Sequence, residues 1–173
     1  MQDLEIKKAT IHDVNQLQKI GKQTFIETYA SFNTEENLKA YLENNFSKKK
    51  LKTALIAQHS EFYFAILRNT IIGYLKINIG QPPEEVKDKN TIEIERIYVY
   101  AEYYGKKVGQ ALCEKAVKIA KEKKVSFLWL GVWEENQRAI HFYQKNGFTQ
   151  FGTHVFKLGN DEQTDFLMKL QIN

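Results

Sequence analysis

Residues 91–123 constrain the fold of this chain more than any other stretch. They have the pattern of a strand rich in β-branched residues, then a tight turn containing Gly105, Lys106, Lys107 and Gly109, then an amphipathic helix. A helix that begins directly after such a turn presents backbone N–H groups without helical acceptors, at the positive end of its dipole. Because two lysines share the turn, the pattern predicts a binding site for a phosphorylated ligand.

The rest of the chain predicts one domain spanning residues 1–173, a length sufficient for a hydrophobic core. Apolar residues make up 43% and charged residues 27%, a balance typical of a globular protein. Pro82 and Pro83 are adjacent, and no Ser/Gly-rich linker or internal repeat interrupts the sequence.

The charge pattern argues against a nucleic-acid surface, because the net charge is only +4 and acidic residues alternate with the lysines. The one cysteine, Cys113, precludes an intrachain disulfide and is interpreted as a core residue of the predicted helix. The four histidines show no metal-ligand spacing, so we expect no metal. We expect a cytoplasmic protein without a membrane partner, since the N-terminal residues lack the apolar run of a signal peptide and no stretch could span a bilayer.

Hydrophobic periodicity predicts helices early in the chain and strands later. Thr10 with Asp13 resembles a capping box before a helix with an apolar face; Asn33 or Thr34 is expected to cap a second helix, and Ser47 a third. Strands are predicted near residues 4–6, 62–67, 71–79, 91–99, 125–133, 148–158 and 163–172, with a polar loop over residues 80–90. This order predicts an α/β fold with a mixed sheet.

A second group of candidate functional residues follows the strand at 125–133. Asn136 and Tyr143 are seven residues apart, so two helical turns place them on one helix face. Asn136 can cap this helix, and Gly147 is a typical helix stop. A buried phenol such as that of Tyr143 could donate a proton to a leaving thiolate, although such a tyrosine is also common in protein cores.

The strand, turn and helix, followed by a strand and N-x-x-A-x-x-F-Y-x-x-x-G-F, resemble the GNAT superfamily of acetyl-CoA-dependent N-acetyltransferases. Several segments are similar to its bacterial spermidine/spermine N-acetyltransferase branch: TFIETY, NLKAYLENNF, IEIERIYV, GVWEENQRAIHFYQKNGF and the tail LGNDEQTDFLM. The resemblance implies a GNAT-like, mostly antiparallel sheet of about seven strands flanked by about four or five helices.

The resemblance also implies roles for individual residues. The backbone of Ile97, Tyr98 and Val99 would pair with the pantetheine arm of coenzyme A, and Asn136 would contact the same arm. Tyr143 would be the general acid toward the departing thiolate. The pyrophosphate would be bound by the turn and the first helical residues, namely Gly105, Lys106, Lys107, Val108, Gly109 and Gln110.

Two positions depart from the family pattern Gln/Arg-x-x-Gly-x-Gly/Ala. Tyr104 stands in place of the initial Gln/Arg, and Lys107 in place of the first motif glycine. If that position requires a positive φ, Lys107 is strained by ~1 kcal/mol, which an ammonium–phosphate contact could partly offset.

The substrate amine must lose a proton before it attacks, and a carboxylate can accept it. Period-two alternation places Glu93 and Glu95 on one strand face, so Glu95 is the first candidate base and Glu93 the second. Pairing with Lys or Arg at a sheet end is an equally good interpretation of either glutamate alone. Candidates for an acidic groove that recruits a polycation are Glu27, Glu35, Glu36, Glu43, Asp161 and Asp165.

The predicted activity is acetyl transfer from acetyl-CoA to a primary amine, most simply a small-molecule polyamine such as spermidine or spermine. Two alternatives stay open: acetylation of a protein N-terminus or lysine, and a catalytically silent acyl-CoA-binding regulator. The exposed edge of the last strands is compatible with a homodimer.

Overall fold

The computed structural model describes residues 3–80, 82–158 and 161–172. Over these residues the chain forms five α-helices, which are α1 (Val14–Tyr29), α2 (Glu35–Asn45), α3 (Lys48–Ile56), α4 (Val108–Glu122) and α5 (Gln137–Lys145). Short 3-10 helices are η1 (Ile11–Asp13), η2 (Ala30–Phe32) and η3 (Ala101–Tyr103).

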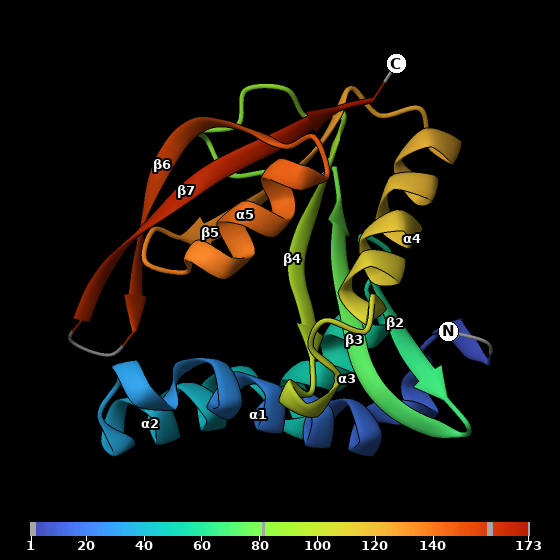
Figure 1. Ribbon diagram of the computed structural model, residues 1–173, viewed down its shortest axis with the longest axis vertical. Helices are drawn as coiled ribbons and strands as arrows, with labels where there is room; N and C mark the ends of the chain where they lie inside the picture. The colour runs from blue at the N-terminus through green and yellow to red at the C-terminus, as the bar shows by residue number, and fades with distance from the viewer. Residues whose placement is uncertain (1–2, 81, 159–160, 173) are drawn as a thin grey trace. The chain divides into compact units, whose positions relative to one another are not determined.

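The strands are β1 (Leu4–Lys8), β2 (Ser60–Leu67), β3 (Thr70–Ile79), β4 (Thr91–Val99), β5 (Phe127–Trp133), β6 (Thr149–Leu158) and β7 (Asp161–Gln171). They form one seven-stranded sheet in the order β1-β2-β3-β4-β5-β7-β6 (Figure 1). β4 and β5 run parallel, whereas β1 with β2, β5 with β7 and β6 with β7 run antiparallel. The predicted α/β class with a mixed, mostly antiparallel sheet is therefore confirmed.

The chain divides into two compact units, residues 1–76 with 96–115 and residues 77–95 with 116–173. β3, β4 and α4 each contribute residues to both units. The single domain over residues 1–173 stays a prediction.

Local capping explains where the helices of the first unit begin. The Asp13 carboxylate accepts a hydrogen bond from the backbone N–H of Thr10, as the predicted capping box requires, and a further one from the Thr10 hydroxyl. Thr34 caps α2 and Ser47 caps α3, each through its side-chain oxygen. The inner face of α1 is buried as its periodicity predicts, at Val14, Leu17, Ile20, Gly21, Thr24 and Phe25.

The hairpin between β2 and β3 is tighter than predicted. Arg68 (φ 47°) and Asn69 (φ 65°) both adopt positive φ, as a two-residue type I′ turn demands, and Thr70 already belongs to β3. The prediction of a three-residue connection was wrong by that one residue.

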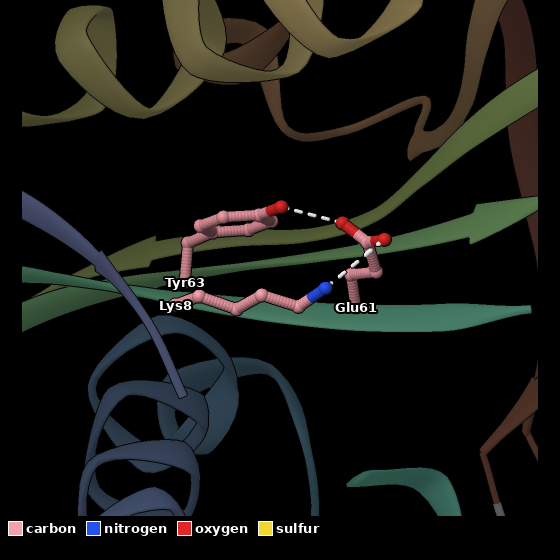
Figure 2. Close-up of polar contacts among 3 residues, drawn as sticks. All are labelled: Lys8, Glu61 and Tyr63. Atoms are coloured by element: carbon pink, nitrogen blue, oxygen red, sulfur yellow. Dashed lines mark hydrogen bonds and ion pairs between the residues drawn. The ribbon is translucent and has the colours of Figure 1, made fainter. Parts of the chain in front are cut away.

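A polar cluster joins β1, β2 and α4 in the first unit. The Glu61 carboxylate accepts a hydrogen bond from the Tyr63 hydroxyl and lies 3.1 Å from the Lys8 Nζ (Figure 2). On α4, the Lys115 Nζ lies 4.9 Å from the centroid of the Tyr63 ring. Tyr63 itself is buried, so this cluster satisfies a phenol that the core would otherwise leave without an acceptor.

In the second unit, β5 begins later than predicted. Lys124 adopts a positive φ of 52°, and the Val125 N–H donates to the Ala120 carbonyl at 3.2 Å. Val125 therefore belongs to the connection that caps the C-terminus of α4, and the strand starts at Phe127. β7 begins at Asp161, two residues before the prediction, and Gly159 and Asn160, which lie between the two predicted strands, are outside the described residues.

The connection between β3 and β4 has no helix or strand over its described residues 80 and 82–90, which confirms the predicted loop. It is not polar throughout, because Val86 is buried against Trp129 and Leu167. The next residue back, Glu85, places its Oε1 2.9 Å from the His154 Nδ1 on β6. These contacts tie the loop to the strands of the second unit.

Candidate functional site

The predicted phosphate turn forms the link between β4 and α4 in the first unit. After β4 the chain passes through η3, where the Ala101 N–H donates to the Glu27 carboxylate on α1 at 2.8 Å. Gly105 (φ 75°) and Lys107 (φ 62°) then adopt positive φ directly before α4. The positive φ on which the predicted strain at Lys107 depends is therefore present.

The first turn of α4 leaves backbone N–H groups without helical acceptors. The helical hydrogen bonds begin with the Ala111 N–H, which donates to the Lys107 carbonyl at 3.1 Å. The N–H groups of Val108 and Gly109 therefore have no acceptor one turn earlier in the helix. Gly105, Lys106 and Lys107 are exposed, whereas Val108 is buried and fixes the start of the helix.

The two lysines of the turn differ in their surroundings. The Lys106 Nζ lies 4.9 Å from the centroid of the Tyr103 ring, a cation–π contact. Lys107 directly precedes α4, and its carbonyl accepts the first helical hydrogen bond. Exposed ammonium groups next to N–H groups at a helix N-terminus fit the diphosphate of coenzyme A in charge and in hydrogen-bonding capacity.

Strand β4 holds the two candidate bases. The Asn78 Nδ2 on β3 donates to the Glu93 Oε2 at 2.8 Å and to the Glu95 Oε2 at 2.6 Å. The two glutamates therefore share one face of the strand, as the alternation predicts. Sequence reasoning missed Asn78, although an amide inside an otherwise apolar strand is a signal that could have found it.

The parallel ladder between β4 and β5 runs from Thr91, opposite Phe127, to Glu93, opposite Trp129. Glu95 lies past the last paired residue of this ladder, and so do Ile97, Tyr98 and Val99. The pairing of these three residues with a pantetheine arm stays a prediction.

The side chain of Tyr98 is used in the core of the first unit. Its hydroxyl lies 3.3 Å from the Tyr29 hydroxyl, and its ring centroid lies 6.0 Å from that of Tyr74. Burial, with smaller contributions from the neighbouring tyrosines, raises the pKa of Tyr98 well above its ordinary value. Tyr98 is therefore a neutral phenol, and any contact with a substrate would come from its backbone.

Helix α5 in the second unit carries the other predicted pair. The Asn136 Oδ1 accepts the Ala139 N–H at 3.2 Å, which confirms its capping role. Tyr143 is 8% exposed, and its ring lies edge-on to Phe142 and Phe148, at 5.1 and 5.5 Å between centroids. Gly147 ends the helix with a φ of 86°.

Other residues considered from the sequence lie in surroundings that do not indicate a role in binding or catalysis. Cys113 is buried, and burial raises the pKa of its thiol to about 12, so it is neither a nucleophile nor a base. Glu35 and Glu36 lie in the first turn of α2, where they interact favourably with the helix dipole. Glu27 lines a groove of about 500 Å³ with Lys19, Lys22, Tyr100 and Glu102, a mixed rather than acidic lining. The side chain of Asp161 lies outside the described part of the chain.

Asp165 on β7 differs from the other acidic candidates. Its Oδ2 would lie only 3.3 Å from a Cβ atom on Gly131, so the carboxyl occupies the space that this glycine leaves. Burial raises the pKa of Asp165 to about 6, against a lowering effect of His154, while Glu134 contributes to the increase.

Within residues 3–80, 82–158 and 161–172, no group of three His, Cys, Asp or Glu side chains is arranged to hold a metal ion. In the same ranges, no helix combines the length and the apolar character needed to cross a bilayer.

The family model described as "Acetyltransferase (GNAT) family" matches residues 22–148. An uncharacterized N-acetyltransferase of Lactobacillus delbrueckii subsp. lactis is 37% identical over 98% of both chains. A spermidine N(1)-acetyltransferase of Thermoplasma acidophilum is 29% identical over 96% of both chains. Among solved structures, the PaiA N-acetyltransferase of Thermoplasma acidophilum in complex with coenzyme A superposes with a TM-score of 0.82 at 29% identity, over 97% of this chain and 98% of the other.

Proposed function

This chain belongs to the acetyltransferase (GNAT) family, whose members transfer an acetyl group from acetyl-CoA to an amine, and we propose that its acceptor is a polyamine such as spermidine or spermine. The observation that carries the proposal is the pair of carboxylates, Glu93 and Glu95, that one amide holds side by side on β4. Two adjacent negative charges attract a polycation more strongly than a singly charged amine. The similarity to a spermidine N(1)-acetyltransferase over nearly the whole chain supports the same class of substrate.

In the proposed binding mode, the turn before α4 binds the diphosphate of acetyl-CoA. The N–H groups of Gly105, Lys107, Val108, Gly109 and Gln110 would donate to its oxygens, and Lys106 and Lys107 would supply positive charge. The Lys106 N–H is not among these donors, because it donates to the Tyr103 carbonyl at 3.3 Å. The backbone of Ile97, Tyr98 and Val99 would pair with the pantetheine arm, which Asn136 would also contact.

In the proposed reaction, Glu95 accepts a proton from the ammonium of the substrate, directly or through a water, with Glu93 as the second candidate. The neutral nitrogen then attacks the thioester carbonyl carbon, the carbon–sulfur bond breaks, and the Tyr143 hydroxyl donates its proton to the departing thiolate. A backbone N–H near Ile97 or Tyr98 would stabilise the developing oxyanion. Holding both substrates in reacting geometry is the largest contribution, up to ~7–11 kcal/mol.

The substrate class is tested by incubating the purified protein with acetyl-CoA and following free thiol release. The panel contains spermidine, spermine, a monoamine, a lysine peptide and a peptide with a free N-terminus. We expect the highest kcat/KM with a polyamine, and Glu93→Gln should raise the KM for spermidine but not for acetyl-CoA. Glu84→Gln, on the exposed loop, is the control. Preferential acetylation of either peptide would contradict the polyamine proposal and favour a protein acceptor. Tight CoA binding without turnover would favour a catalytically silent regulator.

The role of Tyr143 is tested by Tyr143→Phe, which removes only the hydroxyl. We expect kcat to fall by about 100-fold, at the lower end of the range for general acid catalysis, with little change in KM. Tyr41→Phe is the matched control, because that ring stacks on Phe25 in the first unit and has no proposed role in the reaction. Full turnover by Tyr143→Phe would exclude Tyr143 as the proton donor.

A further inference from the structure

Asn78 is the residue that connects the two carboxylates of β4. Its one amide nitrogen donates to the Glu93 Oε2 at 2.8 Å and to the Glu95 Oε2 at 2.6 Å. A primary amide carries two N–H groups, so a single side chain serves both acceptors. The two oxygens consequently lie no farther apart than the sum of these distances. Asn78, Glu93 and Glu95 all belong to the second unit, and all three side chains are half-buried.

Two carboxylates this close repel each other, and each favours protonation of the other. Hydrogen bonds donated to the ionised form act in the opposite direction and are worth about 1.5–3 kcal/mol when one partner is charged. A lysine at the same place would also hold the carboxylates together, but it would cancel one negative charge. An asparagine orients both without adding a positive charge.

We propose that Asn78 is a positioning residue of this acetyltransferase, which holds Glu95 and Glu93 ionised and correctly oriented for the incoming amine. The inference rests on the proposed function, because Asn78 acts only through the two candidate bases. Asn78 itself touches neither the amine nor the thioester in this scheme.

Other charged groups also lie on the elements around this pair. On β4 the next residue is Arg96, whose guanidinium carbon lies 4.5 Å from the centroid of the Phe46 ring. On β3, the Lys76 Nζ lies 5.5 Å from the centroid of the Phe62 ring. On β7, the Lys169 Nζ lies 5.2 Å from the centroid of the Phe127 ring. On β5, the residue opposite Glu93 is the uncharged Trp129. The wild type and the variants at position 78 carry the same three cations, so the comparison between them changes only the side chain at that position.

The first test needs no substrate. The side-chain carboxyl carbons of Glu93 and Glu95 are titrated by NMR in the wild type and in Asn78→Leu, which keeps the size of the side chain but has no donor. Glu93→Gln and Glu95→Gln assign the signals. We expect the titration midpoints to rise by about one pH unit in Asn78→Leu. Asn90→Leu is the control, since the Asn90 Nδ2 donates to the Lys124 carbonyl away from the pair. Midpoints that do not move overturn the proposal.

If Asn78→Leu does not fold, Asn78→Asp serves in its place, because it has the same shape and replaces the donor with a third carboxylate. The midpoints should then rise further than in the leucine variant. Unchanged midpoints in a folded Asn78→Asp protein would overturn the proposal equally.

The second test links this effect to the reaction. The profile of kcat/KM against pH is measured with the amine that the wild type acetylates best. In Asn78→Leu the acidic limb should move up by about one pH unit while the plateau at high pH is largely kept, and Asn90→Leu should overlay the wild type. Shifted midpoints with an unmoved limb overturn the role in the reaction. A wild type that acetylates no amine overturns the proposed function, and the titration then still decides whether Asn78 controls the carboxylates.

Discussion

Lys107 has a backbone conformation that a glycine adopts at lower energy. Its φ of 62° lies in the left-handed region, which costs an L-residue of this size about 1–2 kcal/mol. The lysine is exposed, so packing gives no reason for this choice. A charged side chain that would contact a phosphate does give one, because strain at a binding turn can be offset by the ligand contact.

We therefore expect Lys107→Gly to raise the melting temperature by about 2 °C, since relief of the strain exceeds the extra entropy of a glycine. The same variant should bind CoA more weakly, because it lacks the ammonium. Lys107→Ala separates the two effects: it keeps the strain, so its melting temperature should not rise, while its affinity for CoA should fall as far. Calorimetry without and with CoA measures both, and a lower melting temperature for Lys107→Gly would contradict the strain.

Asp165 gives a pH-dependent prediction. Its pKa rises from an ordinary 3.8 to about 6 in the folded protein, mainly because of burial. Between these two values the folded state binds more protons than the unfolded state, so this residue makes stability fall as pH rises, with the loss complete above about pH 6.

Asp165→Asn should therefore stabilise the protein at pH 8, by about 2–4 °C in melting temperature after allowance for the partial exposure of the group. At pH 4 the gain should nearly disappear, because the wild-type carboxyl is then protonated in the folded state. Thermal unfolding followed by circular dichroism at both pH values measures this difference. Equal changes in melting temperature at the two pH values would contradict the raised pKa, because the effect would then not depend on whether the carboxyl is ionised.

The positions of Glu93 and Glu95 could be predicted from the sequence, whereas their common partner could not. Glu93 and Glu95 were placed on one strand face correctly, because side-chain alternation is a local property of any strand. Their common partner Asn78 was missed, because it is fifteen and seventeen residues away and depends on which strands pair. Strand pairing is set by the whole sheet rather than by the local pattern.

At the scale of elements, Gly73 decides how closely β3, β4 and α4 pack in the first unit. A Cβ atom at this position would lie 2.9 Å from the Tyr98 carbonyl oxygen and 3.4 Å from the Leu112 Cδ1. The first contact is with backbone, so it cannot be relieved by a side-chain rotation. Glycine is therefore required at position 73 because the β4 backbone lies too close for a Cβ atom, and not because of its own φ.

Gly73→Ala should consequently displace β4 at Tyr98 and lower the free energy of unfolding by about 1–3 kcal/mol. Because Ile97, Tyr98 and Val99 are the proposed pantetheine segment, the KM for acetyl-CoA should rise in the same variant. Gly152→Ala on β6 is the matched control, since its Cβ would meet the Leu167 Cδ1 at an ordinary 3.5 Å. Urea unfolding together with steady-state kinetics measures both quantities, and equal effects at the two glycines would refute the argument.

Element boundaries were predictable where a local signal sets them. Thr10 with Asp13, Thr34 and Ser47 each act at the predicted helix start, because a cap needs only its own neighbours. The start of β5 was predicted two residues too early, because Lys124 adopts the left-handed conformation that glycine usually marks and extends the connection after α4. The short helix η3 was missed as well; the Glu27 carboxylate on α1 supports it from a distant part of the sequence.

At the scale of the whole molecule, the two compact units are connected by continuous secondary structure. β3, β4 and α4 each supply residues to both, so unfolding one unit would break strands and a helix that the other uses. We therefore expect one cooperative thermal transition. A ligand that binds only the folded chain should shift that single transition rather than split it.

Coenzyme A provides this test. At a concentration 100 times its Kd, a ligand adds about 2.7 kcal/mol of stability, which corresponds to a rise of about 5–10 °C for a chain of this size. Pantetheine, which lacks the diphosphate, should give a much smaller shift at the same concentration, because the N-terminus of α4 and the exposed Lys106 and Lys107 would have no anion to bind. Lys106→Ala with Lys107→Ala should reduce the shift with CoA and leave the shift with pantetheine unchanged. Equal shifts with the two ligands in the wild type would mean that the turn at Gly105 does not bind the diphosphate, and the proposed placement of the thioester would have to be abandoned with it.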